Sequence, residues 1–134
     1  MTPNSVRPEI RWAVEAAQDK QAGDITVLNL SGAGAFAEYF LLCSGRSQPQ
    51  IKAIAEAIEE RLDRAGRHLA HREGKSGAEW VLLDYGDFVV HIFSERAREY
   101  YDLERLWRHA ERVDFPATEK PPDSRADSDL GTTQ

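Results

Sequence analysis

Hydrophobic and polar residues alternate along the chain with two different periods, and these periods predict its helices and strands. Apolar residues recur every three or four positions in three segments, which is the spacing of an amphipathic helix. These predicted helices cover residues 9–22, 47–65 and 94–110. Runs rich in β-branched and aromatic residues predict strands at 25–30, 39–44, 68–73, 79–84 and 88–93, of which 68–73 is the weakest. The order α-β-β-α-β-β-β-α predicts an α/β sandwich, in which helices flank a mixed sheet.

Two of the predicted helices carry signals that define their limits. Ser47 can cap the second helix, Gln50 follows three residues later as in a capping box, and Gly66 ends the helix. Ser94 opens the last helix. Its expected core-facing stripe consists of Ala97, Tyr100, Leu103, Leu106, Trp107 and Ala110.

The chain has the length of one domain, and its composition changes near the C-terminus. It contains 134 residues, enough to bury a core without disulfides or metals. From Pro116 onward there is no aromatic residue and only one large aliphatic residue, Leu130. We therefore predict a flexible N-terminus over 1–8, a folded domain over 9–115 and a disordered acidic tail over 116–134.

The charge balance is acidic and narrows the classes of partner. There are 17 Lys and Arg against 23 Asp and Glu, which gives a net charge of −6. The segment 116–134 has four acidic and two basic residues, a net of −4 + 2 = −2, so −4 belongs to residues 1–115. A surface that grips phosphates needs an excess of Lys and Arg, so we expect a basic partner and no sequence-specific nucleic-acid binding.

Three absences indicate a cytoplasmic protein. No run of about 18 apolar residues could span a membrane, and residues 1–8 lack the apolar core of a signal peptide. The single cysteine, Cys43, cannot form an internal disulfide, which fits a reducing compartment. Because Cys43 ends the apolar run 39–43, we expect it to be buried.

The strands at 79–84 and 88–93 form a predicted hairpin that carries the most informative side chains. A two-residue turn at Tyr85-Gly86 would place Asp84 opposite Asp87 and Trp80 opposite His91. Opposed carboxylates repel, so turn N–H groups, an internal arginine or a cation of a partner should compensate them. Two interpretations remain open: the aspartates cap the turn and Trp80 is core, or Trp80 is an exposed anchor beside acidic groups, as in an interface hot spot.

Other patterns that could carry chemistry are weaker. Asp84, Asp87 and His91 could together bind a metal, whereas His68 and His71 would point to opposite faces of a strand. Residues 32–37 fit G-x-G-x-x-A, but the apolar run that follows leaves no room for the helix that a dinucleotide site requires. No cofactor is therefore predicted.

Three segments of the chain closely resemble one known family. They are Y-F-L-L-C-S-G at 39–45, W-V-L-L-D-Y-G-D-F-V-V-H-I-F at 80–93 and E-Y-Y-D-L-E-R-L-W at 99–107, with Ser47 and Gln50 opening the helix between the first two. The chain resembles the ribosomal silencing factor family, also called RsfS or Iojap-like, from about Ile10 to Ala110.

The resemblance implies a non-catalytic protein with a nucleotidyltransferase-like fold and no cofactor. Such proteins bind the large ribosomal subunit through ribosomal protein L-fourteen, block subunit joining, lower translation when nutrients are short, and are commonly homodimers. The implied partner-binding residues are Glu73, Trp80, Asp84, Tyr85, Asp87 and Tyr101. The alternative function is a metal-dependent nucleotidyltransferase-like enzyme that uses Asp84, Asp87 and His91.

Overall fold

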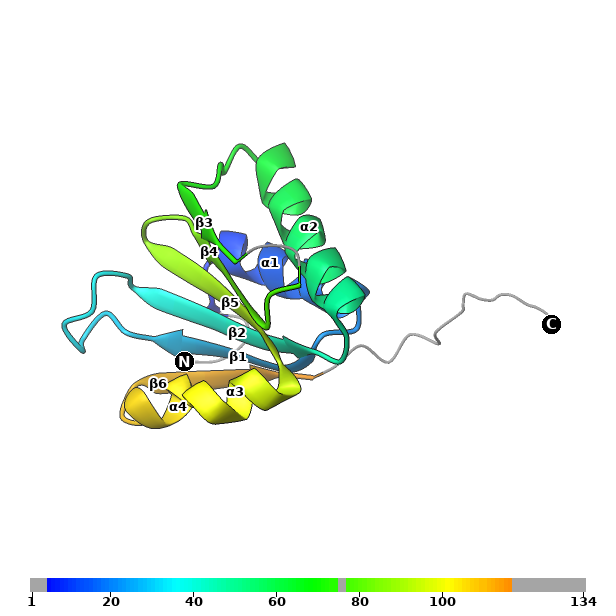
Figure 1. Cartoon of the computed structure of the whole chain (residues 1–134). Helices are drawn as coiled ribbons and strands as arrows, with labels where there is room; N and C mark the ends of the chain where they lie inside the picture. Colours follow the sequence, from blue (N-terminus) through cyan, green and yellow to red (C-terminus); the bar gives the residue numbers. More distant parts are fainter. Residues whose placement is uncertain (1–4, 75–76, 117–134) are drawn as a thin grey trace.

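A six-stranded mixed sheet with helices on both faces forms the domain (Figure 1). The computed structural model describes residues 5–74 and 77–116. The strands are β1 (Gly23–Asn29), β2 (Tyr39–Gly45), β3 (His71–Glu73), β4 (Trp80–Asp84), β5 (Phe88–Ser94) and β6 (Glu111–Phe115). Their order across the sheet is β3-β4-β5-β2-β1-β6, and β2 with β5 is the parallel pair among antiparallel ones. This arrangement confirms the predicted α/β fold.

Two long helices cover one face of the sheet. They are α1 (Pro8–Asp19) and α2 (Gln48–Arg64). Ser47 caps α2, because its hydroxyl oxygen accepts a hydrogen bond from the Gln50 backbone N–H at 3.2 Å. The Gln50 side chain accepts from the Arg46 N–H at 2.6 Å and donates to the carbonyls of Lys20 and Gln21, both at 3.0 Å. One side chain thus joins the start of α2 to the end of α1.

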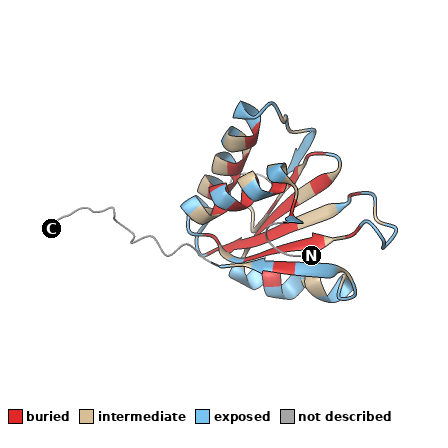
Figure 2. Ribbon diagram, turned by 180° about the vertical axis from the view of Figure 1, so that it is seen from behind, coloured by how far each residue is buried: buried red, intermediate tan, exposed pale blue. Residues whose placement is uncertain are grey.

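The apolar side chains form two cores, one on each face of the sheet. The main core lies between the sheet and α1 with α2, and it includes Val81, Leu83 and the buried Cys43. Cys43 is buried, as predicted, and burial raises the pKa of its thiol to about 12. The smaller core lies on the other face and includes Leu42 and Phe93. In Figure 2 the buried residues accordingly gather along the central strands and the inner sides of the helices.

The last predicted helix is interrupted, and the single helix predicted over 94–110 is therefore wrong. The structure has α3 (Glu95–Tyr101) and the four-residue α4 (Leu103–Leu106), separated by Asp102 in the left-handed conformation with φ 48°. The break turns Glu104 back toward Arg98 of α3, whose guanidinium donates to both carboxylate oxygens at 2.9 and 3.2 Å. Two residues of the expected core stripe, Tyr100 and Leu106, are consequently exposed.

The ends of the domain also differ from the sequence boundaries. Within the segment 1–8, Val6 is buried in the main core and Arg7 is ion-paired, so the ordered domain begins before residue 9. At the other end β6 pairs with β1, a strand that the periodicity did not predict. Of the predicted tail, Pro116 is described and its carbonyl accepts from the Gln18 side chain at 2.9 Å. The rest of the tail, 117–134, lies outside the described residues. No described helix is long and apolar enough to cross a membrane.

Candidate functional site

The β4–β5 hairpin has a different register from the predicted one. Its two-residue turn is Gly86-Asp87, closed by the Tyr85 N–H donating to the Phe88 carbonyl at 3.0 Å. Gly86 has φ 94°, and a glycine at the first central position is what a type II′ turn requires. Asp84 therefore lies opposite Val89 and Trp80 opposite Phe93, which corrects the predicted pairs Asp84–Asp87 and Trp80–His91.

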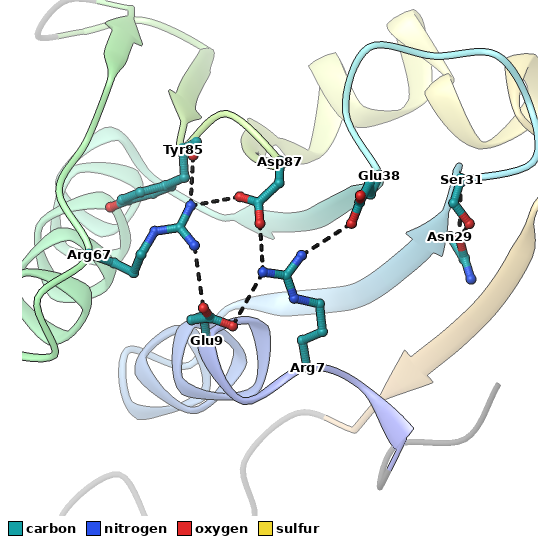
Figure 3. A network of polar contacts seen from close by, with 8 residues as sticks. All are labelled: Arg7, Glu9, Asn29, Ser31, Glu38, Arg67, Tyr85 and Asp87. Atoms are coloured by element: carbon teal, nitrogen blue, oxygen red, sulfur yellow. Dashed lines mark hydrogen bonds and ion pairs between the residues drawn. The ribbon is translucent and has the colours of Figure 1, made fainter.

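The two hairpin aspartates are compensated separately, within the chain. The Asp84 carboxylate accepts the Gly86 N–H at 2.8 Å and so caps the turn. The Asp87 carboxylate is clamped between Arg7 and Arg67, with both N–O distances at 2.6 Å (Figure 3). Burial raises the pKa of Asp87, but the hydrogen bonds and charges of Arg67 and Arg7 outweigh it and hold this pKa below its ordinary value.

The Asp87 clamp joins the hairpin to the helices of the main core. Arg67 also donates to the Tyr85 carbonyl at 2.7 Å, and Glu9 of α1 lies 3.3 Å from Arg67 (Figure 3). The Tyr85 ring stacks on Phe88 at 5.1 Å and is only 5% exposed. Burial raises the pKa of Tyr85 to about 12. The side chains of Tyr85 and Asp87 are therefore committed to internal contacts.

The opposite side of β4 and β5 carries a partly uncovered apolar surface, which we call the aromatic face. Leu82 and Val89 are half-buried there, although Leu83 and Val90 on the main-core side are fully buried. The rings of the aromatic face are Phe40, Trp80, His91, Phe93, Tyr101 and Trp107. Trp80 is at the centre, with ring centroids 4.5 Å from Tyr101 and 5.0 Å from Phe93.

His91 lies beneath Trp80 and fixes its orientation. The indole Nε1–H of Trp80 donates to His91 Nδ1 at 3.1 Å, so the proton of the neutral imidazole is on Nε2. The imidazole is 4% exposed, and Nε2 has no hydrogen-bond partner among the described residues. Burial lowers the pKa of His91 to about 4, so the ring is neutral near pH 7.

The structure does not assemble the predicted metal site. Asp87 is held by two arginines on the main-core side, while His91 lies under Trp80 on the aromatic face. Within residues 5–74 and 77–116, no group of three His, Cys, Asp or Glu side chains is arranged to hold a metal ion. The alternative function, a metal-dependent enzyme, required Asp84, Asp87 and His91 to lie together, and they do not.

Four of the six predicted partner-binding residues lie on or beside the aromatic face. Glu73 is exposed on β3, where it contacts His71 and pairs with Leu82, so that its side chain shares the sheet face of Trp80. Asp84 shares this face as well, and Tyr101 packs on Trp80 from α3 while remaining 48% exposed. The structure brings these four together and separates Tyr85 and Asp87 from them.

A buried arginine beneath this layer was missed at the sequence level. Arg98 is 8% exposed and donates to the Ser44 hydroxyl at 3.0 Å as well as to Glu104. Glu104 in turn contacts Arg112 at 3.1 Å. The sequence signal was available, because Arg98 follows Ala97 in the helix and faces the sheet one residue beyond the apolar stripe. It was overlooked because arginine is rarely buried.

The buried neutral His91 predicts an acid-sensitive fold. The unfolded chain binds this proton near pH 6.5 and the folded protein only near pH 4, so the unfolded state binds more protons in between. Stability should therefore fall as the pH falls through this window, by about 2 kcal/mol between pH 7 and pH 5. Urea unfolding at each pH measures this loss.

The matched variant for this measurement is His91→Gln, whose amide oxygen can still accept from the Trp80 indole. Since glutamine does not titrate, the difference in stability between the two proteins should grow toward neutral pH. Parallel pH profiles for the two proteins would show that His91 is not the responsible group.

The described residues define an α/β domain whose distinctive surface is the partly exposed aromatic face, a kind of apolar patch that marks protein-binding domains. The sequence model of the family described as "Ribosomal silencing factor during starvation" matches residues 3–133. The chain belongs to this ribosomal silencing factor family, which confirms the resemblance seen in the sequence.

Individual relatives and solved structures agree with this assignment. The chain is 43% identical over 106 residues to the ribosomal silencing factor RsfS of Bacillus subtilis, covering 79% of this chain and 90% of that protein. It is 32% identical over 110 residues to the chloroplastic protein Iojap of Arabidopsis thaliana, covering 80% of this chain and 46% of that protein. A crystal structure of a Chromobacterium violaceum protein, 36% identical, superposes with a TM-score of 0.72 over 75% of this chain and 83% of that one. A Bacillus halodurans structure, 40% identical, gives 0.66 over 73% and 91%.

Proposed function

We propose that this ribosomal silencing factor acts in the cytoplasm by binding the large ribosomal subunit through ribosomal protein L-fourteen, and that it thereby blocks subunit joining when nutrients are limiting. The observation that carries the proposal is the half-buried Trp80 at the centre of the aromatic face, in a domain that belongs to this family. Partly covered apolar patches of this kind mark protein-binding sites.

The aromatic face has the composition of an interface hot spot. Trp80 supplies a large apolar ring that His91 already holds in place, so little conformational freedom is lost on binding. Glu73 and Asp84 add negative charge to the same sheet face as Trp80, and residues 1–115 carry a net −4. Acidic groups at the rim of an interface attract a basic ribosomal protein and mainly increase the association rate.

The proposed partner contacts come from Glu73, Trp80, Asp84 and Tyr101. Tyr85 and Asp87 contribute indirectly, because the Arg7–Asp87–Arg67 clamp fixes the hairpin that carries Trp80. Blocking subunit joining requires no chemistry. It requires a bound domain at the position where the small subunit must dock.

Sedimentation of ribosomal subunits with added protein tests this function. We expect the protein to co-migrate with isolated large subunits and to reduce the fraction of joined ribosomes in proportion to its occupancy. Leu82→Arg is the matched variant, since it places a positive charge on the aromatic face without entering the main core. The proposal is wrong if the wild-type protein stays at the top of the gradient or leaves subunit joining unchanged. The expected homodimer stays a prediction, which light scattering of the purified protein would test.

A further inference from the structure

The segment from α4 to the start of β6 lacks the acidic excess of the rest of the domain. Residues 103–112 contain Arg105, Arg108 and Arg112 against Glu104 and Glu111, a local net of +3 − 2 = +1. The side chains of Arg105, Arg108 and His109 are exposed. An outward-facing cationic segment is unexpected in a domain whose net charge is −4.

The two exposed arginines of this segment are not neutralised within the described part of the chain. Most other arginines are ion-paired: Arg7, Arg61, Arg67, Arg72, Arg96, Arg98 and Arg112. Arg105 and Arg108 form no ion pair with any residue in 5–74 or 77–116, and Arg108 Nη1 instead donates to the Arg105 carbonyl at 3.2 Å. The neighbouring Glu104 is already held by Arg98 and Arg112. The Arg108 guanidinium thus contacts the Arg105 backbone, and neither guanidinium is paired with a described carboxylate.

Apolar groups lie between these cations. Leu106 is 68% exposed, and the half-buried Trp107 helps to line a cleft of about 570 Å³. The opposite wall of this cleft is the loop after β1, from Ser31 to Ala33. Arginines in the same short segment as a cleft-lining indole can serve single-stranded RNA, since phosphates need positive charge and bases stack on aromatic rings.

This cationic segment lies on the same side of the sheet as the aromatic face. The Trp107 ring contacts Phe40 at 6.2 Å, and Phe40 contacts His91, the partner of Trp80, at 4.5 Å. If a ribosomal protein binds at Trp80, the parts of the ribosome that adjoin this protein would lie next to Arg105 and Arg108.

We propose that Arg105 and Arg108 bind RNA phosphates of the large subunit beside the ribosomal protein that occupies the aromatic face, with the Trp107 cleft open to an unstacked base. This inference rests on the proposed function and adds a second, sequence-independent contact to it. RNA is favoured over an acidic protein segment because the uncompensated arginines are combined with an accessible indole. The contact is to the backbone, which agrees with the expectation of no sequence-specific nucleic-acid binding.

The salt dependence of binding tests the RNA contact. The variant Arg105→Gln/Arg108→Gln is compared with Arg11→Gln/Arg64→Gln, which removes the same charge from exposed positions on α1 and α2. Affinity for intact large subunits is measured over a series of potassium chloride concentrations, and affinity for isolated ribosomal protein L-fourteen is measured in parallel.

For intact subunits, we expect the Arg105/Arg108 variant to bind about tenfold more weakly, with a slope of log affinity against log salt that is smaller by about 2. Its affinity for the isolated ribosomal protein should equal that of the wild type, and the Arg11/Arg64 control should change neither slope nor affinity by a comparable amount. An unchanged slope, or an equal loss on the isolated protein, overturns the RNA contact while leaving the proposed function intact. Absence of any wild-type binding to large subunits overturns both.

Discussion

Replacing Trp80 by alanine should weaken binding to the large subunit by about 100-fold, the loss expected of a central aromatic anchor. The indole is the ring to which Tyr101 and Phe93 pack and is held by the His91 hydrogen bond, so truncation removes the centre of the aromatic face. Titration of large subunits with labelled protein measures this loss. The salt slope should stay near that of the wild type, because no charge is removed.

Two further variants separate binding from folding. Trp12→Ala removes another half-buried tryptophan, one that packs on the main core of the opposite face with Arg61 5.9 Å from its ring. We expect this variant to keep its affinity for large subunits. Trp80→Phe retains an aromatic ring without the N–H donor and should recover part of the binding. If Trp12→Ala and Trp80→Ala lose affinity equally, the aromatic face is not the binding surface.

Replacing Arg98 by methionine should lower the free energy of unfolding by about 2 kcal/mol, because it removes the donor to the Ser44 hydroxyl and leaves Glu104 with Arg112 alone. Arg98 holds Glu104 and the Ser44 hydroxyl, and thereby fixes the break between α3 and α4 that directs Tyr101 and Leu106 outward. Urea unfolding followed by tryptophan fluorescence measures the change.

The control for this substitution lies two residues earlier on the same helix. Arg96→Met removes an exposed arginine paired with Glu79, and exposed pairs contribute little to stability, so we expect almost no change. The double variant Arg98→Met/Glu104→Gln should recover part of the loss, since it also removes the carboxylate that has lost its two bonds to Arg98. Equal stabilities of Arg98→Met and the wild type would contradict the structural role of Arg98.

Periodicity correctly predicted the helices and strands whose limits are set by residues close together in the sequence. The Ser47 cap and the apolar stripe of α2 are local signals, and both are present in the structure, although Gln50 accepts from the Arg46 N–H and not from the Ser47 N–H of a full capping box. The break at Asp102 is accompanied by the contact of Arg98 with Glu104 in the next helix. The spacing of apolar residues does not show such a contact between polar side chains. In β6 only Val113 is buried, so its pattern does not distinguish a strand from a polar turn.

In the hairpin, the sequence predicted which side chains need internal partners but not which residues supply them. The sequence predicted that the negative charges of Asp84 and Asp87 need compensation. Turn N–H groups and an internal arginine were among the expected sources, and both occur in the structure. The sequence could not show that Arg7 and Arg67, 60 positions apart in the chain, would meet at Asp87, because this depends on how α1 packs against the hairpin. The shift of the turn by one residue placed Asp87 in the turn itself, where Arg7 and Arg67 hold it.

The two outer strands of the sheet have a consequence for the solubility of the protein. β3 consists of His71, Arg72 and Glu73, and β6 carries Glu111, Arg112 and Asp114, whereas the inner strand β1 runs through buried Ile25, Val27 and Leu28. Charged, short edge strands resist pairing with strands of other molecules. β6 therefore shields the backbone of β1, and the sheet is protected from edge-to-edge aggregation at both of its sides.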